Sequence, residues 1–119
     1  MQVVDADSIA KKLREFASER DWNKFHTPKN IATSISVEAA ELLELYQWSV
    51  GSSGWDELND PDLKAKTTQE LADVLIYLIR FADLAGIDLN EAVKNKIELN
   101  KSKYPVDKFK GSDRKYNEG

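Results

Sequence analysis

The chain has 119 residues, a net charge of −4 and no cysteine. This length fits one domain with a single modest core, and the lack of cysteine excludes disulfides, thiolate metal sites and a cysteine nucleophile. The negative net charge does not favour nonspecific binding to nucleic acid. No apolar run reaches the ~20 residues of a membrane span, and the N-terminal MQVVDADS lacks a signal-peptide pattern. We therefore expect one cytoplasmic domain over residues 1–119, without nucleic-acid or membrane partners.

The first two expected helices flank an aromatic loop. Ser8 is the expected N-cap of the first helix. Its apolar residues recur at helical spacing, at Ile9, Leu13, Phe16 and Ala17. The stretch RDWNKFHTP breaks this pattern and places Trp22 and His26 in a loop. Thr27–Pro28 is a cap followed by a first-turn proline, which predicts a second helix running to about Trp48.

A flexible connection and a long apolar helix follow. Ser49–Asn59 contains two glycines, and we expect Trp55 to anchor one end of this connection. Asp60–Pro61 predicts the start of a helix that Gly86 ends. The part from Gln69 to Ala85 is apolar almost all the way round, as in a helix buried in a bundle. Its apolar surface exceeds what three neighbours in so small a domain would cover, which predicts burial against a second copy.

The last helix is expected to begin with a capping box. Asp88 and Glu91 have this spacing, Val93 and Ile97 should face inward, and Tyr104–Pro105 should stop the helix. Residues 106–119 are polar and basic, so we expect a tail that is loose or lies against a partner. No strand alternation or sequence repeat is visible. Four to five helices with short connections predict an all-α, four-helix-type bundle with a core over about residues 8–105.

Two pairs of acidic residues share the same spacing of three residues. Glu38 and Glu41 lie on the second expected helix, and Glu70 and Asp73 near the start of the apolar stretch. Such spacing puts the members of a pair on one face of a helix. Ionised carboxylates on a mostly buried helix repel each other and lose hydration unless cations neutralise them. Facing each other, the pairs offer four hard oxygen donors suited to Mg²⁺ or Mn²⁺, and we interpret them as a candidate active site.

Other residues would complete a nucleotide site. Tyr77 lies between Glu70 and Asp73 on the helical wheel with Arg80 close by, and the last helix carries one stripe of Lys96, Asn100 and Lys103. Plainer interpretations stay open. Acidic residues three apart are common on exposed helices, tryptophans are more often core or interface residues than base-stacking platforms, a lone histidine more often packs than binds, and a lysine stripe is usually a solvated face.

The acidic motifs EAAE (Glu38–Glu41) and ELAD (Glu70–Asp73) resemble the ExxE and ExxD motifs of the all-α nucleoside triphosphate pyrophosphohydrolases, called MazG-like. FASERDWNKFHTPKN, EAAELLELYQW, ELADVLIYL and NKIELNKSKYP are similar, in the same order over about residues 10–105, to the single-domain dCTP pyrophosphatase branch. The resemblance implies four main helices assembling as a dimer or a dimer of dimers. It also implies Mg²⁺-dependent hydrolysis of a nucleoside triphosphate, dCTP or a related dNTP, to the monophosphate and pyrophosphate, as in the house-cleaning of nucleotide pools.

The resemblance also assigns roles to individual residues. The implied metal ligands are Glu38, Glu41, Glu70 and Asp73. The implied nucleotide-binding residues are Trp22, His26, Trp48, Tyr77, Lys96 and Asn100. Glu38 is also expected to orient the attacking water and take its proton. Leu13 stands where the family has a pocket histidine, so the base stays open, and dUTP or a damaged nucleotide is an alternative substrate.

Two other classes of protein are alternatives. A carboxylate-bridged di-iron bundle needs Glu-x-x-His motifs, and the single histidine, His26, is three residues from no glutamate. A non-catalytic helical dimer, acting as a regulatory or interaction module, would have the same helices. Magnesium binding distinguishes it, because a scaffold of this kind should not be stabilised by Mg²⁺.

Overall fold

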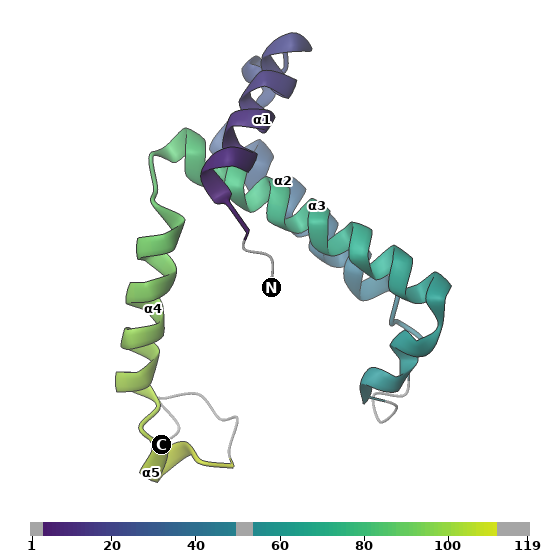
Figure 1. Ribbon diagram of the computed structural model, residues 1–119, viewed down its shortest axis with the longest axis vertical. Helices are drawn as coiled ribbons and strands as arrows, with labels where there is room; N and C mark the ends of the chain where they lie inside the picture. The colour runs from purple at the N-terminus through teal and green to yellow at the C-terminus, as the bar shows by residue number, and fades with distance from the viewer. Residues whose placement is uncertain (1–3, 50–53, 112–119) are drawn as a thin grey trace. The chain divides into compact units, whose positions relative to one another are not determined.

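A computed structural model describes residues 4–49 and 54–111, and all regular structure in these ranges is helical (Figure 1). In chain order the elements are α1 (Ala6–Glu19), the 3₁₀ turn η1 (Asn23–Phe25), α2 (Pro28–Glu44), the 3₁₀ turn η2 (Gly54–Asn59), α3 (Pro61–Ala85), α4 (Leu89–Lys103) and α5 (Val106–Phe109). The predicted all-α class is confirmed for this part of the chain. None of its helices is long and apolar enough to cross a bilayer.

The chain divides into two compact units, Met1–Gly86 and Ile87–Gly119. The first contains α1, α2 and α3, and the second contains α4 and α5. Each unit is described by itself. The single domain expected from chain length stays a prediction.

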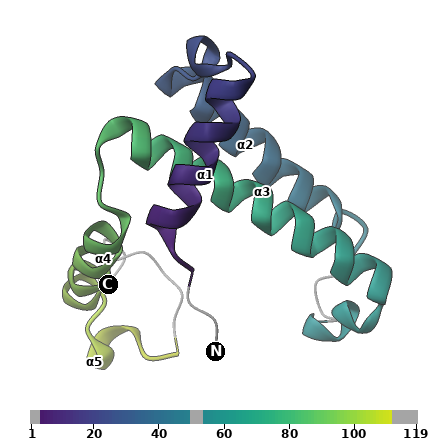
Figure 2. The same ribbon diagram turned by 45° about the horizontal axis from the view of Figure 1, so that its top comes forward.

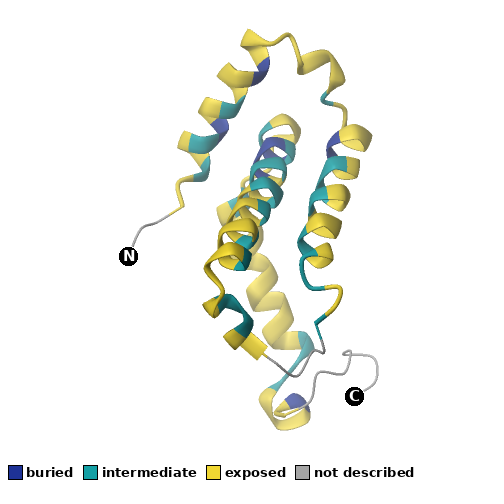
Figure 3. Cartoon of the chain, turned by 90° about the vertical axis from the view of Figure 1, so that its right-hand side faces the viewer, coloured by how far each residue is buried: buried dark blue, intermediate teal, exposed yellow. Residues whose placement is uncertain are grey.

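In the first unit, α3 is the central helix. It runs antiparallel to α2 along most of its length, and α1 packs against its C-terminal part (Figures 1 and 2). Buried and intermediate residues lie on the sides of α1 and α2 that face α3, and exposed residues lie on their outer sides (Figure 3). The buried apolar residues of this unit are mostly small: Ala10, Ala17, Ile31, Ile79 and Ala82. The first unit therefore has a thin core, organised around α3.

Most of the predicted helix ends are confirmed. Thr27 Oγ1 accepts a hydrogen bond from Asn30 N at 3.2 Å, and Asp60 Oδ1 accepts one from Asp62 N at 3.0 Å, each before a proline in the first turn. Gly86 ends α3 with φ of 70°, a left-handed conformation that glycine adopts without a Cβ penalty. The prediction that Ser8 caps α1 is wrong. Asp5 is the cap, because its carboxylate accepts the hydrogen bond that Ser8 N donates, at 3.1 Å.

The second helix is shorter than predicted. It ends at Glu44, and the chain to Trp48 continues in tighter turns, with Tyr46 N donating to Leu43 O at 2.9 Å. The Tyr46 hydroxyl lies 2.6 Å from Thr67 Oγ1 on α3, which ties this turn to the neighbouring helix. Trp55 in η2 is 87% exposed, so the expectation that it anchors the connection is wrong. Residues 50–53 of that connection lie outside the described residues.

The second unit confirms one cap and corrects two expectations. Asp88 Oδ1 accepts a hydrogen bond from Glu91 N at 3.1 Å, as the capping signal predicted. Val93 and Ile97 do not face inward within this unit, since both are exposed. The start of the expected loose tail instead forms α5. Its Phe109 is buried with its ring 5.0 Å from that of Tyr104 in an edge-to-face contact, so apolar packing orders this segment. Residues 112–119 lie outside the described residues.

Candidate metal centre

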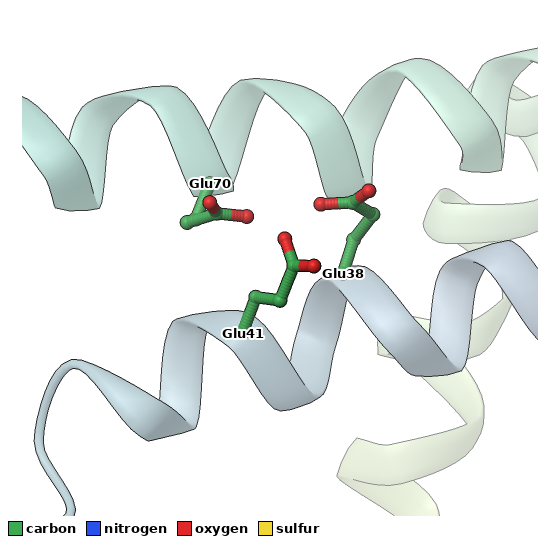
Figure 4. Close-up of side chains that lie close together, drawn as sticks. All are labelled: Glu38, Glu41 and Glu70. Atoms are coloured by element: carbon green, nitrogen blue, oxygen red, sulfur yellow. The ribbon is translucent and has the colours of Figure 1, made fainter.

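Three glutamates from two helices converge between α2 and α3. Glu38 and Glu41 extend from α2 and Glu70 from α3 into the space between the helices (Figure 4). One carboxylate oxygen of each lies within 4.8 Å of the other two. We call these three residues the acidic cluster. The sequence-based prediction that the two acidic motifs face each other is met at these three positions.

The acidic cluster lacks compensating positive charge. Glu38 Oε2 and Glu70 Oε2 are buried and have no hydrogen-bond partner, and no ion pair in residues 4–49 and 54–111 involves the three glutamates. Burial, hydrogen bonding to Glu41 and Glu70 and the charges of Glu41 and Asp73 raise the pKa of Glu38 to about 7. A bound cation would relieve this repulsion, and a shared proton is the alternative.

The donor set fits a small divalent cation. All three donors are carboxylate oxygens, which Mg²⁺ and Mn²⁺ prefer. Mg²⁺ holds its ligands at about 2.0–2.1 Å, so two ligands of one ion lie at most about 4.2 Å apart. The observed spread of up to 4.8 Å is close to this limit, and small side-chain rotations would close the difference. The convergence of the three carboxylates and the two buried oxygens without partners are both features that a bound metal ion would satisfy.

The fourth predicted ligand lies at the edge of this arrangement. Asp73 is half-buried one turn after Glu70 on α3, and its charge contributes to the raised pKa of Glu38. It is not one of the three residues whose oxygens converge. Glu44, near the end of α2, is exposed and also outside the cluster. Glu44 is six residues after Glu38, which places it about 120° away around the helix.

A cavity of about 260 Å³ lies within the first unit. Its lining residues come from the loop after α1, from α2 and from α3: Trp22, Phe25, His26, Asn30, Ile31, Ser34 and Tyr77. The structure thus brings together three of the predicted nucleotide-binding residues, Trp22, His26 and Tyr77. Asn30 was not singled out by sequence, since an amide in a first helical turn carries no pattern of its own.

The other predicted nucleotide-binding residues do not line this cavity. Trp48 is 88% exposed in the turn after α2. Lys96 and Asn100 are exposed on α4, in the second unit. Their role in binding a nucleotide stays a prediction.

Sequence reasoning also missed the role of Arg80. It was expected near the acids, yet its buried side chain donates hydrogen bonds to His26 and Asn23. A signal was available, because an arginine inside the apolar run LIRFA needs a partner when that helix is buried. The contact also places the only histidine of the chain with an arginine, which removes the basis for a di-iron site.

Comparisons with known proteins agree with the acidic motifs. A model of the MazG-like family matches residues 33–118. The chain is 40% identical over 116 residues to human dCTP pyrophosphatase 1, covering 94% of this chain and 66% of that protein. For the mouse protein of the same name the identity is 39% over 110 residues, covering 92% and 65%. The chain thus spans about two thirds of the length of these curated relatives.

The fold is also similar to a solved structure. The crystal structure of a pyrophosphatase from Archaeoglobus fulgidus aligns with a TM-score of 0.78 and 44% sequence identity. The alignment covers 88% of this chain and 96% of the other.

Proposed function

The chain belongs to the MazG-like family, and from that premise we propose that it hydrolyses a nucleoside triphosphate to the monophosphate and pyrophosphate. The expected substrate is dCTP or a related dNTP, because the human and mouse relatives are named for dCTP. The observation that carries the proposal is the convergence of Glu38, Glu41 and Glu70, two of which have buried oxygens without partners.

The acidic cluster is the proposed cation site. Glu38, Glu41 and Glu70 would bind the ion, with Asp73 as a fourth ligand. Mg²⁺ is the expected ion and Mn²⁺ the alternative, since both prefer oxygen ligands. When bound, the cation would offset the negative charge of the carboxylates, attract the phosphate oxygens and make a water molecule more acidic.

Glu38 is the proposed general base. It would orient a water molecule and accept its proton as the water oxygen bonds to the α-phosphorus and the bond to pyrophosphate breaks. The pKa of Glu38 is about 7 in the metal-free protein, and a bound cation would lower it, which keeps the carboxylate ionised and able to accept a proton. Because the chain has no cysteine, direct attack by water is favoured over a thiol-bound intermediate.

The cavity is the proposed site for the base. Trp22 and Tyr77 supply aromatic surfaces for stacking, which contributes about 1–3 kcal/mol per base in nucleic-acid complexes. Ser34, in its wall, lies one turn before Glu38 on α2, and Tyr77 lies two turns after Glu70 on α3. The same two helices therefore carry both sites, and we propose that a ligand in the cavity extends its phosphates toward the carboxylates.

We propose that the active form is a homodimer or homotetramer. Leu71, Leu75 and Leu78 are 55%, 37% and 41% exposed at helical spacing on α3. Trp48 and Trp55 are almost fully exposed as well. So much apolar surface is unusual on a monomer, and a second copy of the chain is the proposed occupant. Light scattering at micromolar concentration should give the mass of a dimer or tetramer, and a monomer would contradict this.

The function is tested with a panel of canonical and modified dNTPs in the presence of Mg²⁺, with separation of the products. Formation of monophosphate and pyrophosphate, abolished by EDTA, is the expected result. Diphosphate and phosphate would identify a different bond cleavage, and the absence of any hydrolysis would contradict the proposal. Lys96→Met and Trp48→Ala should each raise KM if these residues bind the nucleotide.

A non-catalytic helical dimer is the alternative, and the exposed leucines of α3 favour it as much as they favour an oligomeric enzyme. The melting temperature separates the two. An enzyme with this cation site should melt at a higher temperature in Mg²⁺ than in EDTA, whereas a scaffold should melt at the same temperature in both.

A further inference from the structure

Arg80 is a buried cation that joins the central helix to the loop after α1. It is only 4% exposed. Its Nε donates a hydrogen bond to His26 Nδ1 at 3.1 Å, and its Nη2 donates one to Asn23 Oδ1 at 2.7 Å. Nη1 lies 3.9 Å from Asp83 Oδ2, one turn further along α3. We call Arg80, Asn23, His26 and Asp83 the arginine cluster.

The hydrogen bond from Arg80 fixes the tautomer of His26. An arginine side chain is always protonated and has no acceptor, so the Nδ1 atom that it contacts must carry a lone pair. A neutral imidazole then carries its single proton on Nε2. Burial first, and the charge of Arg80 second, lower the pKa of His26, which agrees with a neutral ring. Nε2–H is thus the one polar hydrogen that this ring has left for a ligand.

Arg80 also holds the loop that forms one wall of the cavity. Residues 21–26 make a sharp turn, with Asp21 at φ of 56° and with η1 after it. Trp22, Phe25 and His26 of this turn line the 260 Å³ cavity. The lining also includes Tyr77, which lies three residues before Arg80 on α3. One helix therefore supplies both a lining residue of the cavity and the contacts that hold the lining loop.

We propose that Arg80 is a positioning residue for ligand recognition, which holds His26 as its Nε2–H tautomer so that the cavity offers a fixed hydrogen-bond donor. The matching ligand group is an acceptor on a nucleobase edge, a carbonyl oxygen or a ring nitrogen with a lone pair. The identity of the ligand rests on the proposed function. The tautomer and the role of Arg80 in setting it do not.

The single histidine of the chain makes the tautomer directly measurable. In protein labelled with ¹⁵N-histidine, the NMR spectrum at neutral pH should show His26 protonated on Nε2 alone. Arg80→Met should give a mixture of tautomers, because the donor to Nδ1 is lost. Arg80→Leu, which also removes every donor to Nδ1, is the second variant if Arg80→Met fails to fold. A wild-type ring protonated on Nδ1, or an unchanged tautomer in the folded variants, would overturn the proposal.

Arg14→Met is the matched control. Arg14 Nε lies 3.5 Å from Asp83 Oδ2, so this variant also removes an arginine partner of Asp83, but at an exposed side chain. No hydrogen bond joins Arg14 to His26 in the described part of the chain. The tautomer of His26 should be unchanged in this variant, and a shift as large as in Arg80→Met would assign the effect to Asp83.

Kinetics with the best substrate of the dNTP panel test the ligand step. Arg80→Met and His26→Phe should each raise KM by roughly two- to tenfold, the worth of one hydrogen bond, with kcat nearly unchanged. The double variant should be no worse than His26→Phe, because Arg80 acts through His26. If the two substitutions raise KM additively, or if KM is unchanged, the proposed role of His26 in ligand recognition is overturned. If no nucleotide is hydrolysed, the proposed function fails, while the NMR experiment still decides the role of Arg80.

Discussion

The acidic cluster and the arginine cluster lie on the same helix and differ in how their charge is satisfied. Glu70 and Arg80 are ten residues apart on α3, about 15 Å along its axis. The guanidinium of Arg80 donates to two side chains and faces a carboxylate. In the acidic cluster, like charges face each other and two buried oxygens have no partner. Arg80 Nη1 is also buried without a hydrogen bond, but it faces the carboxylate of Asp83, whereas the acidic cluster has no oppositely charged partner among the described residues.

This difference separates a group that holds the fold from a group that binds a ligand. A buried charge whose partners come from the same chain orders those partners, as Arg80 orders the loop of Asn23 and His26. Buried charges without partners lower the stability of the fold until a ligand provides the missing partner. Replacing a charged residue by a neutral one should therefore lower the stability of the metal-free protein in the arginine cluster but not in the acidic cluster.

The largest expected effect is on catalysis. Glu70→Gln removes one charge from the acidic cluster, and kcat should fall by about a hundredfold or more while the helical circular dichroism spectrum is retained. Glu44→Gln is the control, because Glu44 is an exposed glutamate on α2 outside the cluster. Its activity should match the wild type. Near wild-type turnover in Glu70→Gln would refute the assignment of the acidic cluster.

The next effect is on the stability of the metal-free protein, measured by urea unfolding in EDTA. Arg80→Met should lower the free energy of unfolding by about 1–3 kcal/mol, the usual cost of leaving a buried hydrogen-bond acceptor unpaired. Glu70→Gln should cause no loss, because it relieves repulsion with Glu38 and Glu41. The contrast between the clusters disappears if both variants are destabilised equally.

A smaller effect is expected on the pH dependence of stability. The pKa of Glu38 is raised from 4.5 to about 7, so the folded protein binds this proton more tightly than the unfolded chain. Without metal, the free energy of unfolding should therefore fall as the pH rises from 4.5 to about 7. Urea titrations in EDTA across this range measure the slope. Glu38→Gln should remove this fall in stability, and Glu44→Gln should keep it. Equal slopes in the wild type and both variants would count against a raised pKa for Glu38.

The smallest expected effect is also on the pH dependence of stability; it has the opposite sign to that of Glu38 and comes from His26. Its pKa is lowered from 6.5, because burial and the charge of Arg80 disfavour the protonated ring. The stabilisation that depends on the neutral ring is complete above pH 6.5 and is lost as the pH falls through and below this value, because the unfolded chain takes up the proton first. Unfolding measured in the Glu38→Gln background isolates this slope, and NMR titration of His26 gives its pKa. A pKa above 6.5 would reverse the sign.

Local chemistry made much of the fold predictable. The caps at Thr27 and Asp60 and the left-handed Gly86 depend on neighbouring residues alone, and all three were confirmed. The convergence of Glu38, Glu41 and Glu70 was predictable, because residues three apart lie on the same face of a helix. Two helices with apolar surfaces pack against each other, which brings such faces together. The end of α2 at Glu44 was missed, because it involves tighter turns and the contact of Tyr46 with Thr67, 21 residues away.

The arginine cluster could not be predicted, because it joins residues far apart in sequence. Arg80 and His26 are separated by 54 positions, and neither has a spacing that points to the other. The buried Phe109 was missed for a related reason, since its contact with Tyr104 outweighs the polar composition around it. Spacing predicts what lies on one face of a helix, whereas side chains that meet across a loop are set by tertiary packing.

Calorimetric titration of the metal-free protein with Mg²⁺, repeated with Mn²⁺, tests the central claim most directly. We predict saturable binding to the wild type and to Glu44→Gln, and its loss in Glu70→Gln. Heats that are absent in the wild type, or that persist unchanged in Glu70→Gln, would contradict a shared cation site formed by the two helices.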